Sequence, residues 1–155
     1  MSISFNDFLQ LVPRGLQSFV INLNEYLIDK GCKVSIAVAK NGYVTSYTSP
    51  ATKKTLLNYV FRKTGMKMRI YAANVAKYQD FLNDLPTDVK ENIAKALDCK
   101  KLNGGTCSPT CPAGYAFFMD GAEYRKCRSM AFMPTLNEKN CPFISRFIEL
   151  ELENS

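Results

Sequence analysis

Four cysteines in the second half of the chain have the residue type and spacing of a metal site. Cys99, Cys107, Cys111 and Cys127 follow the pattern C-x7-C-x3-C-x15-C, and three of them lie in a segment rich in glycine and proline. A structural zinc ion takes four soft ligands in a tetrahedron, with ligand pairs often about two to four residues apart. The spacing therefore predicts one closed, structural zinc site. Buried reduced thiols, or a disulfide or redox pair, remain open alternatives.

The other two cysteines lie outside this pattern. Cys32 follows a helix stop at Gly31 and is typical of a packing residue. Cys141 is expected near a helix N-terminus, where the helix dipole can lower the pKa of a thiol. A thiol-dependent enzyme or redox sensor that uses Cys107, Cys111, Cys127 or Cys141 is therefore a second functional hypothesis.

The chain contains no histidine. Histidine is the usual general base near neutral pH, so Ser-His-Asp and Cys-His catalysis are excluded. Zinc sites with histidine ligands and iron sites of the two-histidine, one-carboxylate kind are excluded for the same reason. We name no catalytic residue, and an enzyme is the less favoured interpretation.

A basic and aromatic sheet face is predicted from strand alternation. Met66, Met68 and Ile70 alternate with polar or aromatic residues, and the opposite face then presents side chains that can pair with anions and stack on a ring. The predicted ligand-binding residues are Arg62, Lys67, Arg69, Tyr71, Tyr43 and Tyr47. A solvated polar face would show the same alternation, so that interpretation stays open.

The formal net charge of +6 favours an acidic partner. Our first functional hypothesis is therefore a non-enzymatic, metal-stabilised binding module for nucleic acid or a phosphorylated ligand. A third hypothesis is a protein-interaction domain in which the positive patch is incidental.

The elements that must position these residues follow from periodicity and turn signals. Helical spacing predicts a short helix over 4–10 and a longer one over 14–30. Two hairpins are expected, one around Asn41-Gly42 and one around residues 63–65. Their strands are predicted at 34–38, 43–47, 55–61 and 66–71.

The second half should begin with two helices. One has the apolar stripe Val75, Tyr78, Leu82 and Leu85, and the other has Val89, Ile93, Ala96 and Leu97 after a capping box of Asp88 and Glu91. A third hairpin is expected from 115–119 and 123–128, with a further strand at 129–135. Asn137 or Asn140 should cap a terminal helix with an acidic tail that frays from Glu149.

These elements predict one α+β domain over 1–155, with a cysteine-rich loop and hairpin over 98–128. Strands joined by hairpins give an antiparallel sheet, and the helices should pack on one face of it. No apolar run approaches the roughly 20 residues of a membrane span. The first residues, 1–8, lack the features of a secretory signal, so we expect a cytoplasmic protein without membrane contact.

Three stretches resemble uncharacterised bacterial domains that have a cysteine-containing C-terminal half. They are N-Y-V-F-R-K-T-G-M-K-M-R-I-Y over 58–71, the later C-x3-C-P-x-G-Y, and Y-R-K-C-R. The strand–strand–helix layout is also similar to the small YjbR-like α+β domains. These resemblances imply a small α+β fold and a bacterial source. They imply no established activity, so no catalytic residue is transferred.

Overall fold

The computed structural model describes residues 3–155, and its main feature is an antiparallel sheet. The four strands lie in the order β1-β2-β3-β4, which confirms the predicted pair of hairpins. Their bounds are β1 Lys33–Ala39, β2 Gly42–Thr48, β3 Thr55–Arg62 and β4 Gly65–Ile70. Gly42 and Gly65 have φ values of 115° and 132°, a region that favours glycine, so each turn falls where the sequence places it.

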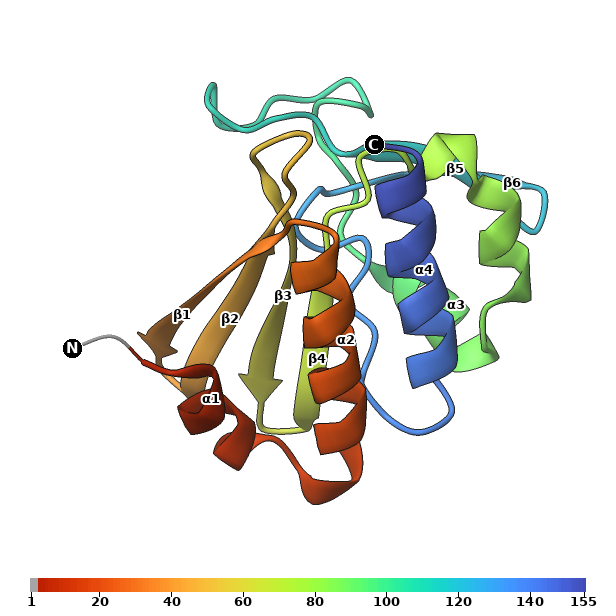
Figure 1. The fold of residues 1–155 in the computed structure, drawn as a ribbon. Helices are drawn as coiled ribbons and strands as arrows, with labels where there is room; N and C mark the ends of the chain where they lie inside the picture. The colour runs from red at the N-terminus through yellow and green to blue at the C-terminus, as the bar shows by residue number, and fades with distance from the viewer. Residues whose placement is uncertain (1–2) are drawn as a thin grey trace.

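Two N-terminal helices, α1 (Phe5–Leu11) and α2 (Gln17–Asp29), pack on one face of this sheet (Figure 1). Helix α1 begins with a capping box: the Asp7 N–H donates to Ser4 Oγ at 3.1 Å, and the Ser4 N–H donates to Asp7 Oδ2 at 3.0 Å. Phe8 of α1 is buried against the rings of Tyr59 and Phe61. The predicted helices in this part of the chain are confirmed.

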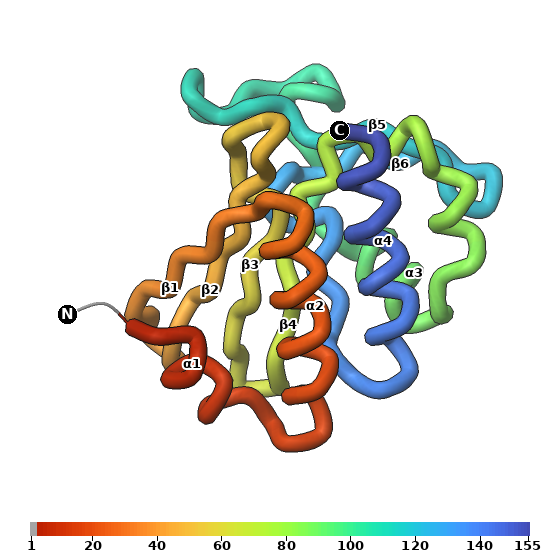
Figure 2. Tube along the Cα trace, in the orientation of Figure 1, coloured from red at the N-terminus to blue at the C-terminus, as the bar shows by residue number. Residues whose placement is uncertain are grey.

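Helix α4 (Cys141–Glu153) lies beside α2 and extends the helical layer (Figures 1 and 2). Beyond it lie α3 (Thr87–Lys95) and a two-stranded sheet of β5 (Tyr115–Met119) and β6 (Ala122–Lys126). The ring centroids of Phe132 and Phe147 lie 5.2 Å apart. The buried side chains of both halves form one continuous core.

The stripe from Val75 to Leu85 forms two 3₁₀ helices, Val75–Lys77 and Gln79–Asp84, and not the predicted α-helix. Neither begins with a side-chain cap. The side chain of Asn74, which could cap the first, donates instead to Glu151. This segment is therefore held by its tertiary contacts, which the local pattern does not encode.

Three further predictions about helix ends were wrong. Helix α3 begins after Pro86 without a side-chain cap, and Asp88 accepts a hydrogen bond from the Asn140 side chain instead of closing a capping box. The same helix ends before Leu97, which is 60% exposed. The acidic tail does not fray, because α4 continues to Glu153 and buries Glu151.

The predicted strand over 129–135 exists only as an irregular segment along β4. The N–H groups of Met68 and Ile70 donate to the carbonyls of Pro134 and Phe132, and one bridge pairs Lys67 with Thr135. Figure 2 shows this segment running beside β4. The outer edge of β4 is therefore covered.

Side chains cover the edge of the second sheet in a different way. The N–H groups of Phe118 and Asp120 donate to the side-chain oxygens of Gln79 and Asn83. Within residues 3–155, β1 is the strand of the main sheet that has a neighbour on one side only. In the same part of the chain, no helix is long and apolar enough to cross a membrane.

Candidate functional site

A wide basic groove lies on the sheet face opposite α1 and α2, at the end where both hairpins turn. Its volume is about 610 Å³. Five basic side chains line it together with the polar Asn41, Thr64 and Asn92 and two methionines, Met130 and Met133. The basic residues are Arg62, Lys63, Lys67, Arg69 and Lys95.

The register of β3 and β4 brings most of these cations together. Lys67 pairs with Val60, and Arg69 pairs with Asn58, so both basic side chains share the face away from the core residues Met66 and Met68. Arg62 ends β3 and Lys63 begins the turn. Lys95 comes from elsewhere, because it is the last residue of α3.

The positive charges of this groove have no acidic partner within the described residues. Among residues 3–155, no acidic side chain lines the groove and none of its five cations forms a salt bridge. Arg69 is anchored, because its Nε donates to the Ser129 carbonyl at 2.8 Å. Among the described residues, Arg62, Lys63, Lys67 and Lys95 therefore line the groove without an acidic partner.

Two predicted ligand-binding tyrosines lie on the opposite face. Tyr47 is fully buried in the core, and its hydroxyl donates to Asn24 of α2 at 2.7 Å. Tyr43 shares that face and packs against the core. The prediction was wrong because strand alternation groups these tyrosines with each other but does not say which face the helices cover.

Tyr71 is also separated from the groove. It follows β4, and the guanidinium of Arg128 lies 4.7 Å from the centre of its ring. Both residues line a different, smaller pocket. The predicted patch is thus divided: Arg62, Lys67 and Arg69 meet in the groove, and Tyr71 does not.

Sequence reasoning missed Lys63, Lys95 and Asn41. Lys63 and Asn41 occupy neighbouring turns, so the hairpin signals already placed them at the same end of the sheet as Arg62. Lys95 carries no such signal, because its place in the groove depends on how α3 packs in the tertiary structure, which local sequence patterns do not predict.

The predicted zinc ligands lie in two pairs. The Cys99 N–H donates to the Arg125 carbonyl and the Cys127 N–H donates to the Leu97 carbonyl, on either side of the bridge between Asp98 and Lys126. Cys99 and Cys127 therefore point to the same face of a short antiparallel ladder. The neighbouring Cys107 thiol raises the pKa of Cys111, whose own Sγ–H donates to the Pro112 carbonyl at 3.2 Å.

Backbone N–H groups surround the sulfur of Cys99. The Gly114 N–H donates to its Sγ at 3.2 Å. Burial opposes ionisation of this thiol, but hydrogen bonds from the N–H groups of Gly114, Leu102 and Lys101 outweigh it and lower the pKa of Cys99. Donors of this kind stabilise a thiolate, the form that binds metals.

Within residues 3–155, no three side chains of the Cys, His, Asp or Glu type lie close enough together to share a metal ion. The four-cysteine zinc site therefore stays a prediction. The segment 104–110 that leads to Cys111 is exposed throughout, so the second pair lies on the less constrained part of the loop.

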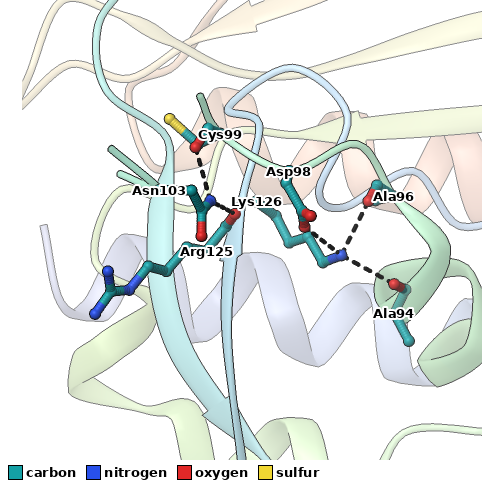
Figure 3. Close-up of polar contacts among 7 residues, drawn as sticks. All are labelled: Ala94, Ala96, Asp98, Cys99, Asn103, Arg125 and Lys126. Atoms are coloured by element: carbon teal, nitrogen blue, oxygen red, sulfur yellow. Dashed lines mark hydrogen bonds and ion pairs between the residues drawn. The ribbon is translucent and has the colours of Figure 1, made fainter. Parts of the chain in front are cut away.

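The cysteine segment is fastened to α3 by a buried lysine (Figure 3). Lys126 is 6% exposed, and its Nζ donates to the carbonyls of Ala94 and Ala96 and to Asp98 Oδ1 at 2.9, 3.0 and 2.9 Å. The two carbonyls belong to the end of α3, which a cation stabilises. On the other side of the ladder, the Asn103 side chain donates to the carbonyls of Cys99 and Arg125.

The remaining cysteines are packing residues. Cys32 and Cys141 are buried. Burial raises the pKa of Cys141 to about 11, although a backbone hydrogen bond from Asn137 acts in the opposite direction. The structure therefore does not show a thiol activated at the start of α4, because the effect of burial on the Cys141 pKa outweighs that of the backbone hydrogen bond.

Comparison with known proteins returned no relative. No protein-family model matches the chain, and neither a curated protein nor a solved structure matches it significantly. The candidate sites are therefore interpreted from their own geometry.

Proposed function

We propose that the protein binds a compact ligand with more than one phosphate group in the basic groove. The observation that supports this is the convergence of five cations without a neutralising carboxylate among the described residues. Arginine and lysine are the usual phosphate-binding residues, and phosphate contacts are strengthened by the charge on both partners.

The lining of the groove favours a compact ligand over a nucleic acid strand. Its volume lies within the range of about 300–1,000 Å³ that is typical of small-molecule sites. No aromatic residue of the described part of the chain lines it, whereas proteins that bind single strands stack bases on aromatic side chains. Met130 and Met133 offer an apolar surface to the uncharged part of a ligand.

The test is a calorimetric titration with inorganic tripolyphosphate, with the double variant Arg62→Ala, Lys67→Ala as the probe of the groove. Arg69 is left in place, because its bond to Ser129 also holds the fold together. Loss of two charge-assisted contacts should weaken binding by at least about tenfold. Binding should also weaken as salt is raised, as expected for a charged site.

A matched control removes two positive charges elsewhere. Lys33 and Arg146 lie outside the groove, so Lys33→Ala, Arg146→Ala has the same net charge as the groove variant. Its affinity should stay within about twofold of the unmodified protein. Equal losses in both variants, or no binding of tripolyphosphate, would reject the groove as a site. If a 20-nucleotide strand bound about tenfold more tightly than tripolyphosphate, the natural ligand of the groove would be nucleic acid instead.

We further propose that Cys99, Cys107, Cys111 and Cys127 bind one structural zinc ion. Four thiolates suit zinc, and the common face of Cys99 and Cys127 together with the contact of Cys107 and Cys111 supplies two ligand pairs. Zinc would join the exposed loop to the ladder that Lys126 anchors. The ion would stabilise the fold and supply no open coordination position for catalysis.

Elemental analysis of the purified, reduced protein tests this proposal. We expect about one zinc per chain, lost in Cys107→Ser and retained in Cys32→Ala, which alters a buried cysteine outside the set. A metal-free protein whose Cys107 and Cys111 oxidise to a disulfide would favour the redox hypothesis.

A further inference from the structure

A second pocket lies at the other end of the sheet, where β2 joins β3. Its volume is about 260 Å³, and it is lined by residues from four separate segments of the chain. The side chains that matter to its chemistry are Ser49, Lys54, Tyr71, Arg128 and Glu151. None of these residues lines the basic groove.

The guanidinium of Arg128 is held in this pocket without an anionic partner. It stacks over the ring of Tyr71 at 4.7 Å from the centroid. Among residues 3–155 it forms no salt bridge and donates no side-chain hydrogen bond. A guanidinium stacked in this way keeps its plane fixed, and its N–H donors remain free in the geometry that suits a carboxylate or a phosphate.

Ser49 provides an independent sign of a missing partner. The residue is 3% exposed, and its Oγ has no hydrogen-bond partner among the described residues. A buried hydroxyl without a partner opposes folding, so its presence calls for an explanation. Ser49 is one of the residues that line this pocket, so a ligand bound there would lie beside it.

The walls of the pocket are fixed before any ligand arrives. The Ser49 N–H donates to the Lys54 carbonyl and the Lys53 N–H donates to the Ser49 carbonyl, both at 2.9 Å, which closes the loop between β2 and β3. The opposite wall is the end of α4, where Glu151 is occupied by donors from Asn74 and Tyr78. Among the described residues Glu151 forms no salt bridge with Arg128, although its carboxyl group lies in the same pocket.

We propose that this pocket is a second binding site, which takes the oxyanion group of a small ligand. Arg128 provides the paired donors, Lys54 adds a second positive charge, and the Ser49 hydroxyl donates to a ligand oxygen. A carboxylate and a phosphate monoester share this chemistry. Because Glu151 lies in the same pocket, the net charge of these groups is smaller than that of the groove, and we expect the singly charged carboxylate to bind better.

Titrations followed by backbone amide NMR shifts test the proposal at constant ionic strength. Acetate is one probe and inorganic phosphate is the other, and both are added to the Arg62→Ala, Lys67→Ala protein so that the groove does not contribute. The amide signals of Ser49, Tyr71 and Arg128 should shift together and reach saturation. Saturation should need a lower concentration of acetate than of phosphate. Preferential saturation by phosphate would instead assign the site to phosphate monoesters.

Variants separate binding from folding. Arg128→Gln and Ser49→Ala should each weaken acetate binding by at least about fivefold. Ser49→Ala is the decisive variant, because it removes a hydroxyl without a partner and should leave the unfolding free energy unchanged or higher. Lys53→Ala, next to Lys54 but outside the pocket, should bind as the unmodified protein does. The absence of saturable shifts with both probes, or unchanged binding in Ser49→Ala, would overturn the proposal without bearing on the groove.

Discussion

Buried tyrosine hydroxyls differ in whether the fold supplies a partner. The Tyr78 hydroxyl donates to the carboxylate of Glu151 at 2.5 Å, and that of Tyr47 donates to Asn24. The hydroxyl of Tyr59 is equally buried, but it has no partner among the described residues. The same hydroxyl group therefore stabilises the protein where it has a partner and opposes folding where it has none.

Substitution by phenylalanine measures this difference. Tyr78→Phe should lower the unfolding free energy by about 1.5–3 kcal/mol, because it removes a hydrogen bond to a charged group and leaves that group under-satisfied. Tyr59→Phe should leave it unchanged or raise it, because only an unpaired hydroxyl is lost. Urea denaturation of both variants measures the unfolding free energies. A larger decrease in Tyr59→Phe than in Tyr78→Phe would contradict the prediction.

Secondary-structure elements were predicted well where the signal is local. The hairpin at Asn41-Gly42 and the strand alternation from Met66 to Ile70 depend on neighbouring residues, and both are present. The segment from Val75 to Leu85 and the location of Lys95 depend on packing between distant parts of the chain, which no periodicity records. The groove was accordingly half predicted: its strand residues were identified and its helical lysine was not.

The junction between the cysteine loop and β5 depends on one glycine. A Cβ at Gly114 would overlap the carbonyl oxygen of Lys126 and lie 3.0 Å from Cβ of Cys99. Gly114 therefore lets the loop approach the ladder closely enough for its N–H to reach the Cys99 sulfur.

Gly114→Ala should lower the unfolding free energy by about 3 kcal/mol, since backbone must move to admit the methyl group. Gly15→Ala is the matched control, because a Cβ at Gly15 meets nothing within 4 Å. That control should stabilise the protein slightly or leave it unchanged. Thermal melting of both variants tests this prediction. Similar melting temperatures would contradict it and would show that the backbone accommodates the methyl group at Gly114.

At the scale of the whole molecule, Glu151 links α4 to the segment that follows β4. Burial raises the pKa of Glu151, and hydrogen bonds from Tyr78 and Asn74 offset only part of that effect. The folded protein therefore binds the Glu151 proton more tightly than the unfolded chain does. Its contribution to stability is complete below the ordinary glutamate pKa of about 4.3 and is lost as the pH rises through the higher pKa of the folded state.

Comparison with Glu151→Gln isolates this contribution. The unfolding free energy of the unmodified protein minus that of the variant should fall as the pH rises from about 4 towards neutrality. Urea denaturation across this range provides the values. A difference that stays constant or grows with pH would contradict the raised pKa.

The sheet edges described above also limit how copies of the chain could join. The segment 132–136 covers β4, and side-chain amides cover β5, so among the described strands of the main sheet β1 alone offers a row of free backbone groups. Val34 and Val38 add exposed apolar surface there. If two copies paired through β1, each would use up its one available edge. Growth would then stop at two chains, because a fibre needs a subunit that can be extended from both sides.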